Sequence, residues 1–600
     1  MRRTQLRRRA PRNGHGAAWF TIAAVVFCGY VAMLTTAAAA RPSTPRLDGT
    51  TTPVEPCSEL ITMTGLPYGT HIVSAVDTPA ANGAVAQCTV LMSAVDDSDP
   101  RGLPGDINIS LQLPDDNWNG NYMAEGGGVY AGTLEPSPTD ANVTAGYAVS
   151  QTDTGHEEDP FTSEWVIDPL GPVDGSEDIN WNRVNDFGYL SLHYMAVDSK
   201  AVIDAYYGLS PKYSFWNGCS TGGRQGLSEA EKYPTDFNGI LAGAPALDWT
   251  QFQAAQMWPQ FVMNWSGDEL PYCKESLVNS ALQANCRDQD GKVDGVFDPR
   301  TCDVIAILKS LIGTSTACGT FTATDAKVVE EIWQGPRDSG SQADLAHGRQ
   351  VWFGLEPGAD MGSTPGLTMG ATEGSDAGVG PQVGVPFVTS YDWWRNWIKR
   401  DQTWTFQDET YSQLWHDFRT VKQMFGYALD VGDPTDLRTF RDDGGKLLMW
   451  QGLADQLIFT GDSINFYNHA LEDLGGINAT ETWFRYFLAP GVSHCGTPGA
   501  GSIAPTDPMQ AVVDWVEQGQ VPDTLAASGT INGANVTRPL CPYPDPDAVY
   551  TGGDPTQSGS YTCDGTAQID DPAIPGPNGL DAKAAISTDR SLRPGHSRPT

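Results

Sequence analysis

Gly218-Cys219-Ser220-Thr221-Gly222 is the stretch that decides the fold of this chain, because it matches the pattern G-x-S-x-G. In that pattern a serine lies on a sharp turn from a strand into a helix, with its hydroxyl exposed. Residues 213–217 are strand-like and residues 223–233 are helix-like, so the flanking segments fit the pattern. A plain glycine-rich turn is the alternative interpretation.

A histidine far along the chain is the candidate base for this serine. His494 comes shortly after the strand-like residues 483–488, and it is followed directly by Cys495. If Cys219 and Cys495 are bonded, their Cα atoms lie roughly 5–6 Å apart. Such a bond would bring Ser220 and His494 near hydrogen-bond reach, which the activation of a serine requires.

Asp455 is the candidate for the side chain that orients the histidine. The order Ser, then Asp, then His along the chain is the order found in α/β-hydrolases. Asp455 and His494 both follow strand-like segments, and open parallel sheets hold their chemistry in loops at the carboxyl ends of strands. The order, the strand contexts and the two flanking cysteines predict that Ser220, Asp455 and His494 are catalytic.

The other histidines have weaker contexts. His156 lies close to a strand-like segment and could support the site through a hydrogen bond. His416 and His469 lie in helix-like, aromatic-rich segments and are interpreted as packed or exposed. The histidines without any supporting context are His71, His193 and His347.

Backbone N–H groups must stabilise the oxyanion that forms when a serine attacks an ester. The N–H of Thr221, directly after the serine, is the expected first donor. The second donor is expected from a glycine loop after the strand-like residues 121–124, because glycine lets a backbone amide approach a ligand closely. The alternative is a plain tight turn. The loop consists of Gly126, Gly127 and Gly128.

The N-terminus predicts export from the cell. Six arginines precede an apolar run at 17–33, and small residues at 35–40 provide an A-x-A cleavage site. Residues 1–40 are therefore interpreted as a signal peptide, with an uncleaved membrane anchor as the alternative. No other stretch is long and apolar enough to span a bilayer. We expect a secreted protein without stable membrane association after cleavage.

Cysteine usage agrees with an oxidising compartment. Eleven cysteines are present, and removal of the signal peptide removes Cys28 and leaves an even set. The most economical local pairings are 57–88, 273–286, 302–318 and 541–563, which leaves 219–495 as the long one. The sequence alone does not establish this connectivity. The ten cysteines are Cys57, Cys88, Cys219, Cys273, Cys286, Cys302, Cys318, Cys495, Cys541 and Cys563.

The charge of the chain restricts its partners. The formal net charge is −37 at pH 7, and the signal segment contributes only positive charge. Nucleic acid and anionic membrane surfaces are therefore excluded as expected partners. Neutral or weakly charged small molecules remain as the expected substrates.

The pattern of segments predicts an α/β fold with one parallel sheet and a large inserted lid domain. Residues 41–56 are rich in Pro and Thr and are interpreted as a flexible lead-in. Strand–helix alternation over 57–247 and again over 436–570 predicts the two parts of a catalytic α/β-hydrolase domain. Residues 248–435 differ in character and are interpreted as the lid, and the polar tail 571–600 is predicted to be disordered.

An acidic, glycine-containing loop in the predicted lid is a candidate calcium site. Calcium takes six to eight oxygens from such loops and mixes carboxylates with backbone carbonyls. No glutamate closes this loop at the EF-hand spacing, so it is not an EF-hand, and a solvated turn is the alternative. The candidate ligands are the side chains of Asp288, Asp290 and Asp294 and the carbonyls of Lys292 and Val296.

Over about residues 57–565 the sequence resembles the tannase and feruloyl esterase family of α/β-hydrolases. The most specific marks are Cys219-Ser220, Asp455 and His494-Cys495, supported by Asn117-Trp118-Asn119-Gly120 and Asp153-Thr154-Gly155-His156. The resemblance implies an exported serine esterase, a lid with a structural Ca²⁺, and a disulfide that links the nucleophile and base loops. It also implies small aromatic ester substrates, such as ferulate or gallate esters, which can be attached to plant polysaccharide or polyphenol.

Two residues depart from the family pattern. Arg287 stands where the calcium loop of the family usually has an aspartate, and Glu125 precedes three glycines where many members have four. An acid at Glu125 could alter the electrostatics of the oxyanion site or could point away from it.

Substrate choice remains open at the level of sequence. A related aryl or alkyl esterase, such as a terephthalate-monoester hydrolase, and a non-catalytic polysaccharide-binding protein are the alternatives. The tryptophan-rich residues 391–415 could form a wall that binds the substrate ring, or they could form the core of the lid. The aromatic residues concerned are Tyr391, Trp393, Trp394, Trp397, Trp404 and Trp415.

Overall fold

The computed structural model describes residues 51–96, 105–134, 136–137, 139–168, 179–287, 295–338, 349–374, 382–499, 501–544 and 548–563. These residues all belong to one unit, which covers 50–600. The predicted signal peptide, most of the lead-in and the predicted tail lie outside the described residues. The same holds for four predicted calcium ligands, Asp288, Asp290, Lys292 and Asp294.

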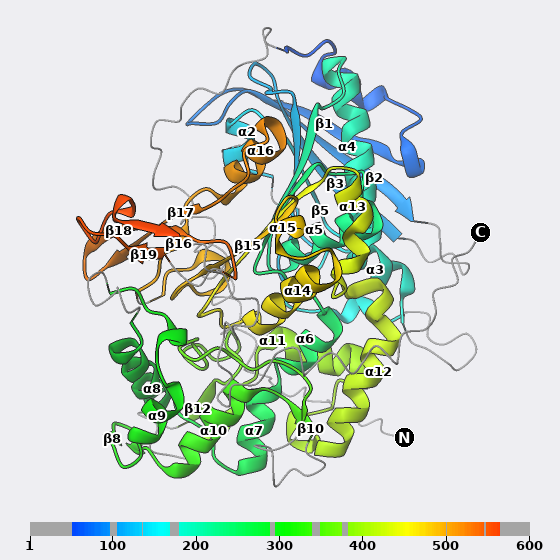
Figure 1. Cartoon of the computed structure of the whole chain (residues 1–600). Coiled ribbons are helices and arrows are strands. Elements are labelled where there is room, and N and C mark those ends of the chain that lie inside the picture. Colours follow the sequence, from blue (N-terminus) through cyan, green and yellow to red (C-terminus); the bar gives the residue numbers. More distant parts are fainter. Residues whose placement is uncertain are drawn as a thin grey trace, which may run out of the picture. The chain divides into compact units, whose positions relative to one another are not determined.

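A nine-stranded mixed sheet forms the centre of the fold (Figure 1). Its strand order is β1-β2-β3-β5-β4-β6-β7-β14-β15, with antiparallel pairing from β1 to β5 and parallel pairing from β5 to β15. The α/β fold predicted from the sequence is confirmed, but the sheet is mixed and not wholly parallel as expected, because β1, β2, β3 and β5 pair antiparallel. The strands are β1 (His71–Thr78), β2 (Gln87–Asp96), β3 (Gly105–Pro114), β4 (Asn121–Glu125), β5 (Ala148–Thr152), β6 (Tyr213–Cys219), β7 (Gly239–Gly243), β14 (Lys446–Gly452) and β15 (Phe484–Ala489).

Two apolar layers cover the two faces of the sheet, because neighbouring residues of a strand point to opposite faces. In β6, Trp216 belongs to one layer and Phe215 to the other, and in β14 Leu447 and Leu448 are divided in the same way. Helices α4 and α14 contribute to the first layer, and α16 contributes to the second. The helices of this part are α2 (Ala141–Thr144), α3 (Trp181–Asn185), α4 (Ser191–Tyr207), α5 (Thr221–Lys232), α13 (Arg438–Asp442), α14 (Thr460–Asp473), α15 (Ile477–Thr480) and α16 (Pro508–Gln518).

Residues 248–435, the inserted segment, contribute helices and short hairpins rather than strands of the central sheet. In Figure 1 its green and yellow-green helices gather on one side of that sheet. The apolar layer in this region is formed mainly by the inserted segment and also includes Tyr130 and Trp165. The helices are α6 (Trp249–Ala255), α7 (Trp258–Ser266), α8 (Tyr272–Asn285), α9 (Val304–Ser310), α10 (Ala323–Gln334), α11 (Val388–Trp393) and α12 (Tyr411–Leu429). The hairpin strands are β8 (Ser315–Thr316), β9 (Gly319–Thr320), β10 (Arg337–Asp338), β11 (Arg349–Gln350), β12 (Thr372–Gly374) and β13 (Gln382–Gly384).

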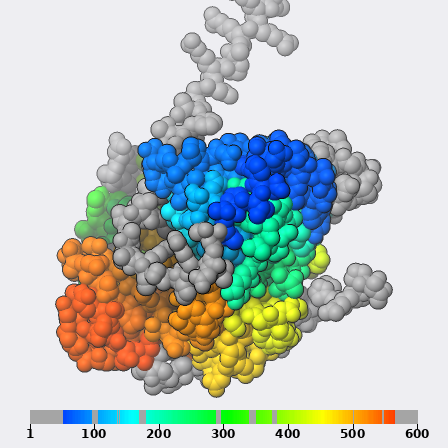
Figure 2. Space-filling view, turned by 90° about the horizontal axis from the view of Figure 1, so that it is seen from above, coloured from blue at the N-terminus to red at the C-terminus, as the bar shows by residue number. Residues whose placement is uncertain are grey.

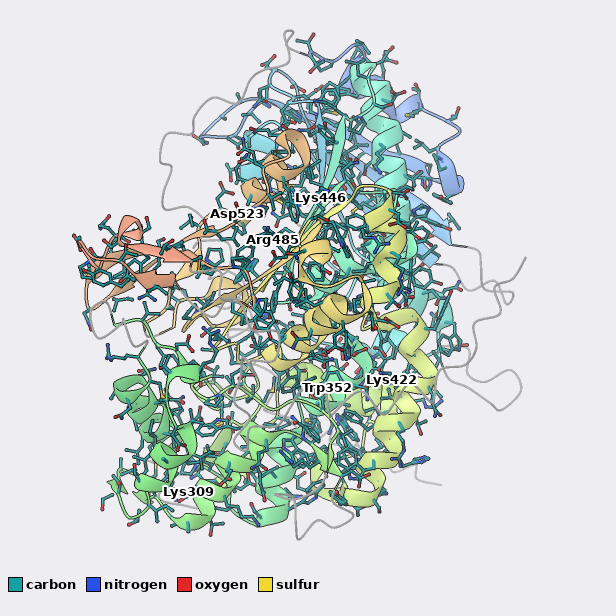
Figure 3. All side chains as sticks on the ribbon, in the orientation of Figure 1. Lys309, Trp352, Lys422, Lys446, Arg485 and Asp523 are labelled. Carbon is teal, nitrogen blue, oxygen red and sulfur yellow. A yellow bond between two sulfur atoms is a disulfide. The ribbon has the colours of Figure 1, made fainter. Side chains whose placement is uncertain are left out.

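Small antiparallel sheets near the end of the described chain are formed by β16, which precedes α16, and by the strands that follow α16. Figure 2 shows the first strands of the chain in blue on one side of the face in view and this C-terminal region in orange and red on the opposite side. Arg485 of β15 forms an ion pair with Asp523 at 3.4 Å, and Figure 3 shows the two residues close together. Across the described residues, no helix has the length and hydrophobicity to cross a bilayer. The strands are β16 (Ala504–Pro505), β17 (Leu525–Ile531), β18 (Ala534–Leu540), β19 (Ala548–Tyr550) and β20 (Tyr561–Cys563).

Ten cysteines form five disulfides, and two of the predicted pairings are wrong. The bonds 57–88, 219–495 and 541–563 are as expected, but Cys273 pairs with Cys318 and Cys286 pairs with Cys302. Helix α8 is the physical reason. Cys273 is the second residue of this helix and Cys286 directly follows its last residue, so the helix separates the two Cα atoms by about 20 Å. A disulfide requires Cα atoms within about 7 Å.

This connectivity can be checked on the native protein. Proteolysis without reduction, followed by mass spectrometry, is expected to yield one cross-linked peptide with Cys273 and Cys318 and another with Cys286 and Cys302. A peptide that joins Cys273 to Cys286 would contradict the described path of α8.

Candidate active site

Ser220 lies on a strained turn between β6 and α5. Its backbone has φ 63° and ψ −125°, a conformation that costs an L-residue about 1–3 kcal/mol. Hydrogen bonds to the backbone at and after the end of β7 hold it there. Ser220 N–H donates to the Gly243 carbonyl at 2.9 Å, and Ala246 N–H donates to the Ser220 carbonyl at 3.2 Å. The strand-to-helix turn expected from the sequence is therefore present.

Glycines make this turn possible because other backbone segments pass very close to it. A Cβ on Gly126 would lie 2.4 Å from the Cα of Gly222, and a Cβ on Gly223 would lie 2.6 Å from the Gly243 carbonyl oxygen. No side chain fits at these distances. The glycine loop after β4 thus packs directly on the first turn of α5.

His494 and Asp455 form a buried hydrogen-bonded pair. The Nδ1 of His494 lies 3.0 Å from Oδ2 and 3.1 Å from Oδ1 of Asp455. Because a carboxylate accepts, Nδ1 carries the proton and Nε2 keeps its lone pair. Asp455 also accepts the backbone N–H groups of Leu457 and Ile458, each at 2.9 Å. These bonds fix the carboxylate that orients the imidazole.

The disulfide connects this pair to the serine turn. The Cα atoms of Cys219 and Cys495, the neighbours of Ser220 and His494, are 5.9 Å apart. The Nε2 of His494 lies 3.5 Å from the sulfur of Cys495. The structure therefore brings the serine and histidine loops together, as the sequence predicted.

The candidate oxyanion donors differ in their availability. Gly126 N–H donates to the Asn217 carbonyl at 3.0 Å, and Gly127 N–H donates to Gln225 Oε1 at 2.9 Å. Within the described chain, the N–H groups of Thr221 and Gly128 have no hydrogen-bond partner. Thr221 begins α5, and the positive end of a helix dipole favours an anion.

Glu125 points its carboxylate at polar side chains on neighbouring segments. It accepts hydrogen bonds from Asn142 at 2.7 Å and Gln151 at 2.9 Å. Burial raises the pKa of Glu125 to about 7, with a contribution from the charge of Asp140. The carboxyl group is thus satisfied by these two amides.

His156 is a buried packing residue close to the glycine loop. Its ring stacks on Trp165 with the centroids 4.2 Å apart, and it leaves no room for a side chain at Gly132. Burial lowers the pKa of His156 to about 3, so the imidazole is neutral. Its Nδ1 lies 3.4 Å from the Thr154 carbonyl oxygen, so His156 supports this region by packing, and a hydrogen-bonding role toward the triad stays a prediction.

The tryptophan-rich segment is the core of the inserted segment. Trp393, Trp394 and Trp397 expose 0–1% of their surface, and Trp404 and Trp415 expose 9% and 6%. Of the two interpretations, core packing is correct for these tryptophans, because their rings contact one another and leave almost no surface for a substrate.

The predicted calcium loop is described only at its two ends. Arg287 and Phe297 form an isolated β-bridge, and the Arg287 guanidinium donates to the Gly295 carbonyl at 3.4 Å. The disulfide 286–302 closes the same loop. Val296 is fully buried in the second apolar layer of the sheet, to which α16 contributes. Among the described residues, no group of three or more His, Cys, Asp or Glu side chains is arranged to hold a metal.

Comparison with known proteins assigns the family. The sequence profile "Tannase and feruloyl esterase" matches residues 88–564, so the chain belongs to the tannase and feruloyl esterase family. A probable feruloyl esterase of Arthroderma benhamiae is 33% identical over 523 residues, which cover 85% of this chain and 92% of that protein. The protein is accordingly a carboxylic ester hydrolase.

Solved structures agree in fold. Feruloyl esterase B from Aspergillus oryzae matches with a TM-score of 0.68 at 21% identity and covers 84% of this chain and 99% of its own. Tannin acyl hydrolase from Aspergillus niger matches with a TM-score of 0.69 at 23% identity and covers 86% of this chain and 93% of its own. These likenesses place the nine-stranded sheet in the α/β-hydrolase fold.

A matched pair of glycine variants tests the packing of the glycine loop. Gly126→Ala is expected to lower kcat at least 10-fold and to lower Tm, because the new methyl group collides with Gly222. Gly559→Ala is the control, since a Cβ there meets no atom within 4 Å and this exposed glycine lies outside the candidate site. Ester hydrolysis rates and thermal melts measure both effects. Equal behaviour of the two variants would show that the loop packs differently.

Proposed function

We propose that this protein is a secreted serine esterase that hydrolyses carboxylic esters of phenolic acids, with Ser220, His494 and Asp455 as a catalytic triad. The observation that carries the proposal is the buried Asp455–His494 pair beside the strained serine turn, with a disulfide between the two loops. The family name, tannase and feruloyl esterase, and the name of the Arthroderma relative support feruloyl or galloyl esters as the substrate class.

The first chemical step forms an acyl-enzyme. The lone pair on His494 Nε2 accepts the proton of Ser220 while the serine oxygen attacks the ester carbonyl carbon. The negative oxygen of the tetrahedral intermediate accepts hydrogen bonds from the N–H groups of Thr221 and Gly128. The C–O bond to the alcohol then breaks, His494 protonates the leaving alcohol, and the acyl group stays on Ser220.

The second step releases the phenolic acid. His494 takes a proton from water, which attacks the acyl carbonyl, and the bond to Ser220 breaks as the serine recovers its proton. Asp455 stabilises the imidazolium that forms in both steps and keeps the imidazole in the required tautomer. A neutral ester in a chain of net charge −37 needs no cationic anchor for this chemistry.

Secretion and a small aromatic ester substrate form part of the same proposal. Five disulfides are typical of proteins that fold in an oxidising compartment. In such a compartment the ester is available as a free molecule or attached to plant polysaccharide or polyphenol.

We further propose a structural Ca²⁺ in the loop at 288–294. Three aspartates in seven residues supply the hard oxygen ligands that this ion prefers, and the 286–302 disulfide holds the ends of the loop together. The side chains of Asp288, Asp290 and Asp294 and the carbonyls of Lys292 and Val296 would hold the ion. Its contribution is to stability and not to a chemical step.

The esterase proposal is tested with three substrates and one variant. Methyl ferulate or methyl gallate is expected to be hydrolysed with a higher kcat/KM than a terephthalate monoester. Ser220→Ala is expected to lower kcat roughly 10⁵-fold or more, because no other group forms the acyl-enzyme. A higher kcat/KM for the terephthalate monoester would favour the aryl-monoester alternative. An unchanged rate for Ser220→Ala would exclude the serine mechanism.

The calcium proposal is tested by thermal melting of the purified protein. Chelation with EGTA is expected to lower Tm by about 5 °C or more, and added Ca²⁺ should restore it, because an ion bound only to the folded state stabilises that state. The double variant Asp288→Asn/Asp290→Asn should melt at the lower temperature with or without EGTA. Insensitivity of the parent protein to chelator and to added Ca²⁺ would remove the ion from the proposal.

A further inference from the structure

Gln456 holds the backbone of the candidate base. Its side-chain Oε1 accepts a hydrogen bond from the backbone N–H of His494 at 3.0 Å. Neighbouring Asp455 binds the ring of the same histidine at 3.0 Å. We infer that Gln456 is a positioning residue, which acts through His494 on the reaction. The inference rests on the esterase function proposed above.

The bond completes a series of cross-links between two loops. Beyond the parallel strands β14 and β15, Leu453 N–H donates to the Ala489 carbonyl at 2.9 Å and Ala454 N–H donates to the Val492 carbonyl at 2.9 Å. The next two residues of the same loop bind His494, because Asp455 contacts its ring and Gln456 contacts its backbone N–H. The first four residues of the loop after β14 (453–459, the acid loop) therefore bind the end of β15 or the loop that follows it (490–496, the base loop).

The backbone around His494 makes such a hold necessary. His494 begins a single turn of 3-10 helix, and Cys495 within it has a left-handed φ of 52°. One turn of this kind is weakly stable by itself. A hydrogen bond to the His494 N–H fixes the start of the turn, and with it the direction in which the ring leaves the backbone.

Gln456 itself is carried on a firmly held loop. The Leu457 carbonyl accepts a hydrogen bond from Gln256 at 2.8 Å, and the Ile458 carbonyl accepts one from Gln451 at 3.0 Å. Gln256 belongs to the inserted segment, whereas Gln451 belongs to β14. The acceptor that Gln456 presents to His494 is thus fixed from two sides.

Three independent contacts define the position of the imidazole. Asp455 sets its rotation, Gln456 sets the start of its turn, and the disulfide from Cys219 fixes the middle residue of that turn, Cys495. A displacement of about 1 Å at a reacting group can lower a rate by 10²-fold. Loss of the Gln456 contact should therefore slow the chemistry while the other two contacts keep the protein folded.

Three substitutions of glutamine test this role on the full chain with p-nitrophenyl acetate. Gln456→Met keeps the size of the side chain and removes the acceptor, and we expect kcat to fall by about 10–100-fold with KM changed less than about 2-fold. Gln456→Glu keeps an acceptor and is expected to recover most of kcat. Its charge should raise the apparent pKa of kcat/KM, because a nearby carboxylate favours imidazolium. The matched control is Gln520→Met at an exposed site, with parental kcat.

A parental kcat in Gln456→Met would overturn the inference. So would a fall in rate that only follows a fall in Tm and that Gln456→Glu fails to recover, because that result describes a purely structural contact. Failure of the proposed function is recognised by a different result, because Ser220→Ala would then hydrolyse the ester at the parental rate. In that case the NMR chemical shift of the His494 Nδ1 proton still tests whether Gln456 positions the histidine. An unchanged chemical shift in Gln456→Met would refute this role.

Discussion

The disulfide between Cys219 and Cys495 is the constraint on which the site depends. It joins positions 276 residues apart, one at the end of β6 and one just beyond β15. Two strands, β7 and β14, separate β6 from β15, so the strands themselves are about 14 Å apart. The base loop must lean across both strands to reach the serine turn, and the bond holds it there. In the chain-entropy treatment, closing so long a loop contributes roughly 5 kcal/mol of stability.

The inserted segment stabilises the site as well as covering one side of the sheet. Gln256 binds the carbonyl of Leu457 in the acid loop, and Tyr130, which follows the glycine loop, donates its hydroxyl to the Thr389 carbonyl at 3.0 Å. Two loops of the candidate site are therefore anchored in the inserted segment. Trp393, Trp394, Trp397, Trp404 and Trp415 are buried in its own core, because a segment of this size must bury apolar surface to hold a fixed shape. Under the proposed function, these five tryptophans are therefore not the side chains that contact a substrate ring.

Secondary structure near the site could be predicted from the sequence, whereas disulfide connectivity could be predicted only in part. The strand at 213–219 and the helix from Thr221 follow from local patterns of apolar and glycine residues. Nearness along the chain predicts the wrong partner for Cys273, because residues near in sequence need not be near in space. A straight helix carries its two ends apart, and only the path of α8 through the fold shows which cysteine lies opposite.

The sequence by itself determined the family, the α/β class and the choice of candidate catalytic side chains, because these depend on residue types in a fixed order along the chain. Ser220, Asp455 and His494 were found in this way. Only the tertiary structure decided which backbone N–H groups remain unpaired, and it was the structure that revealed Gln456. Such contacts are made between loops far apart in sequence, and a glutamine or a glycine carries no local signal of the partner that it will meet.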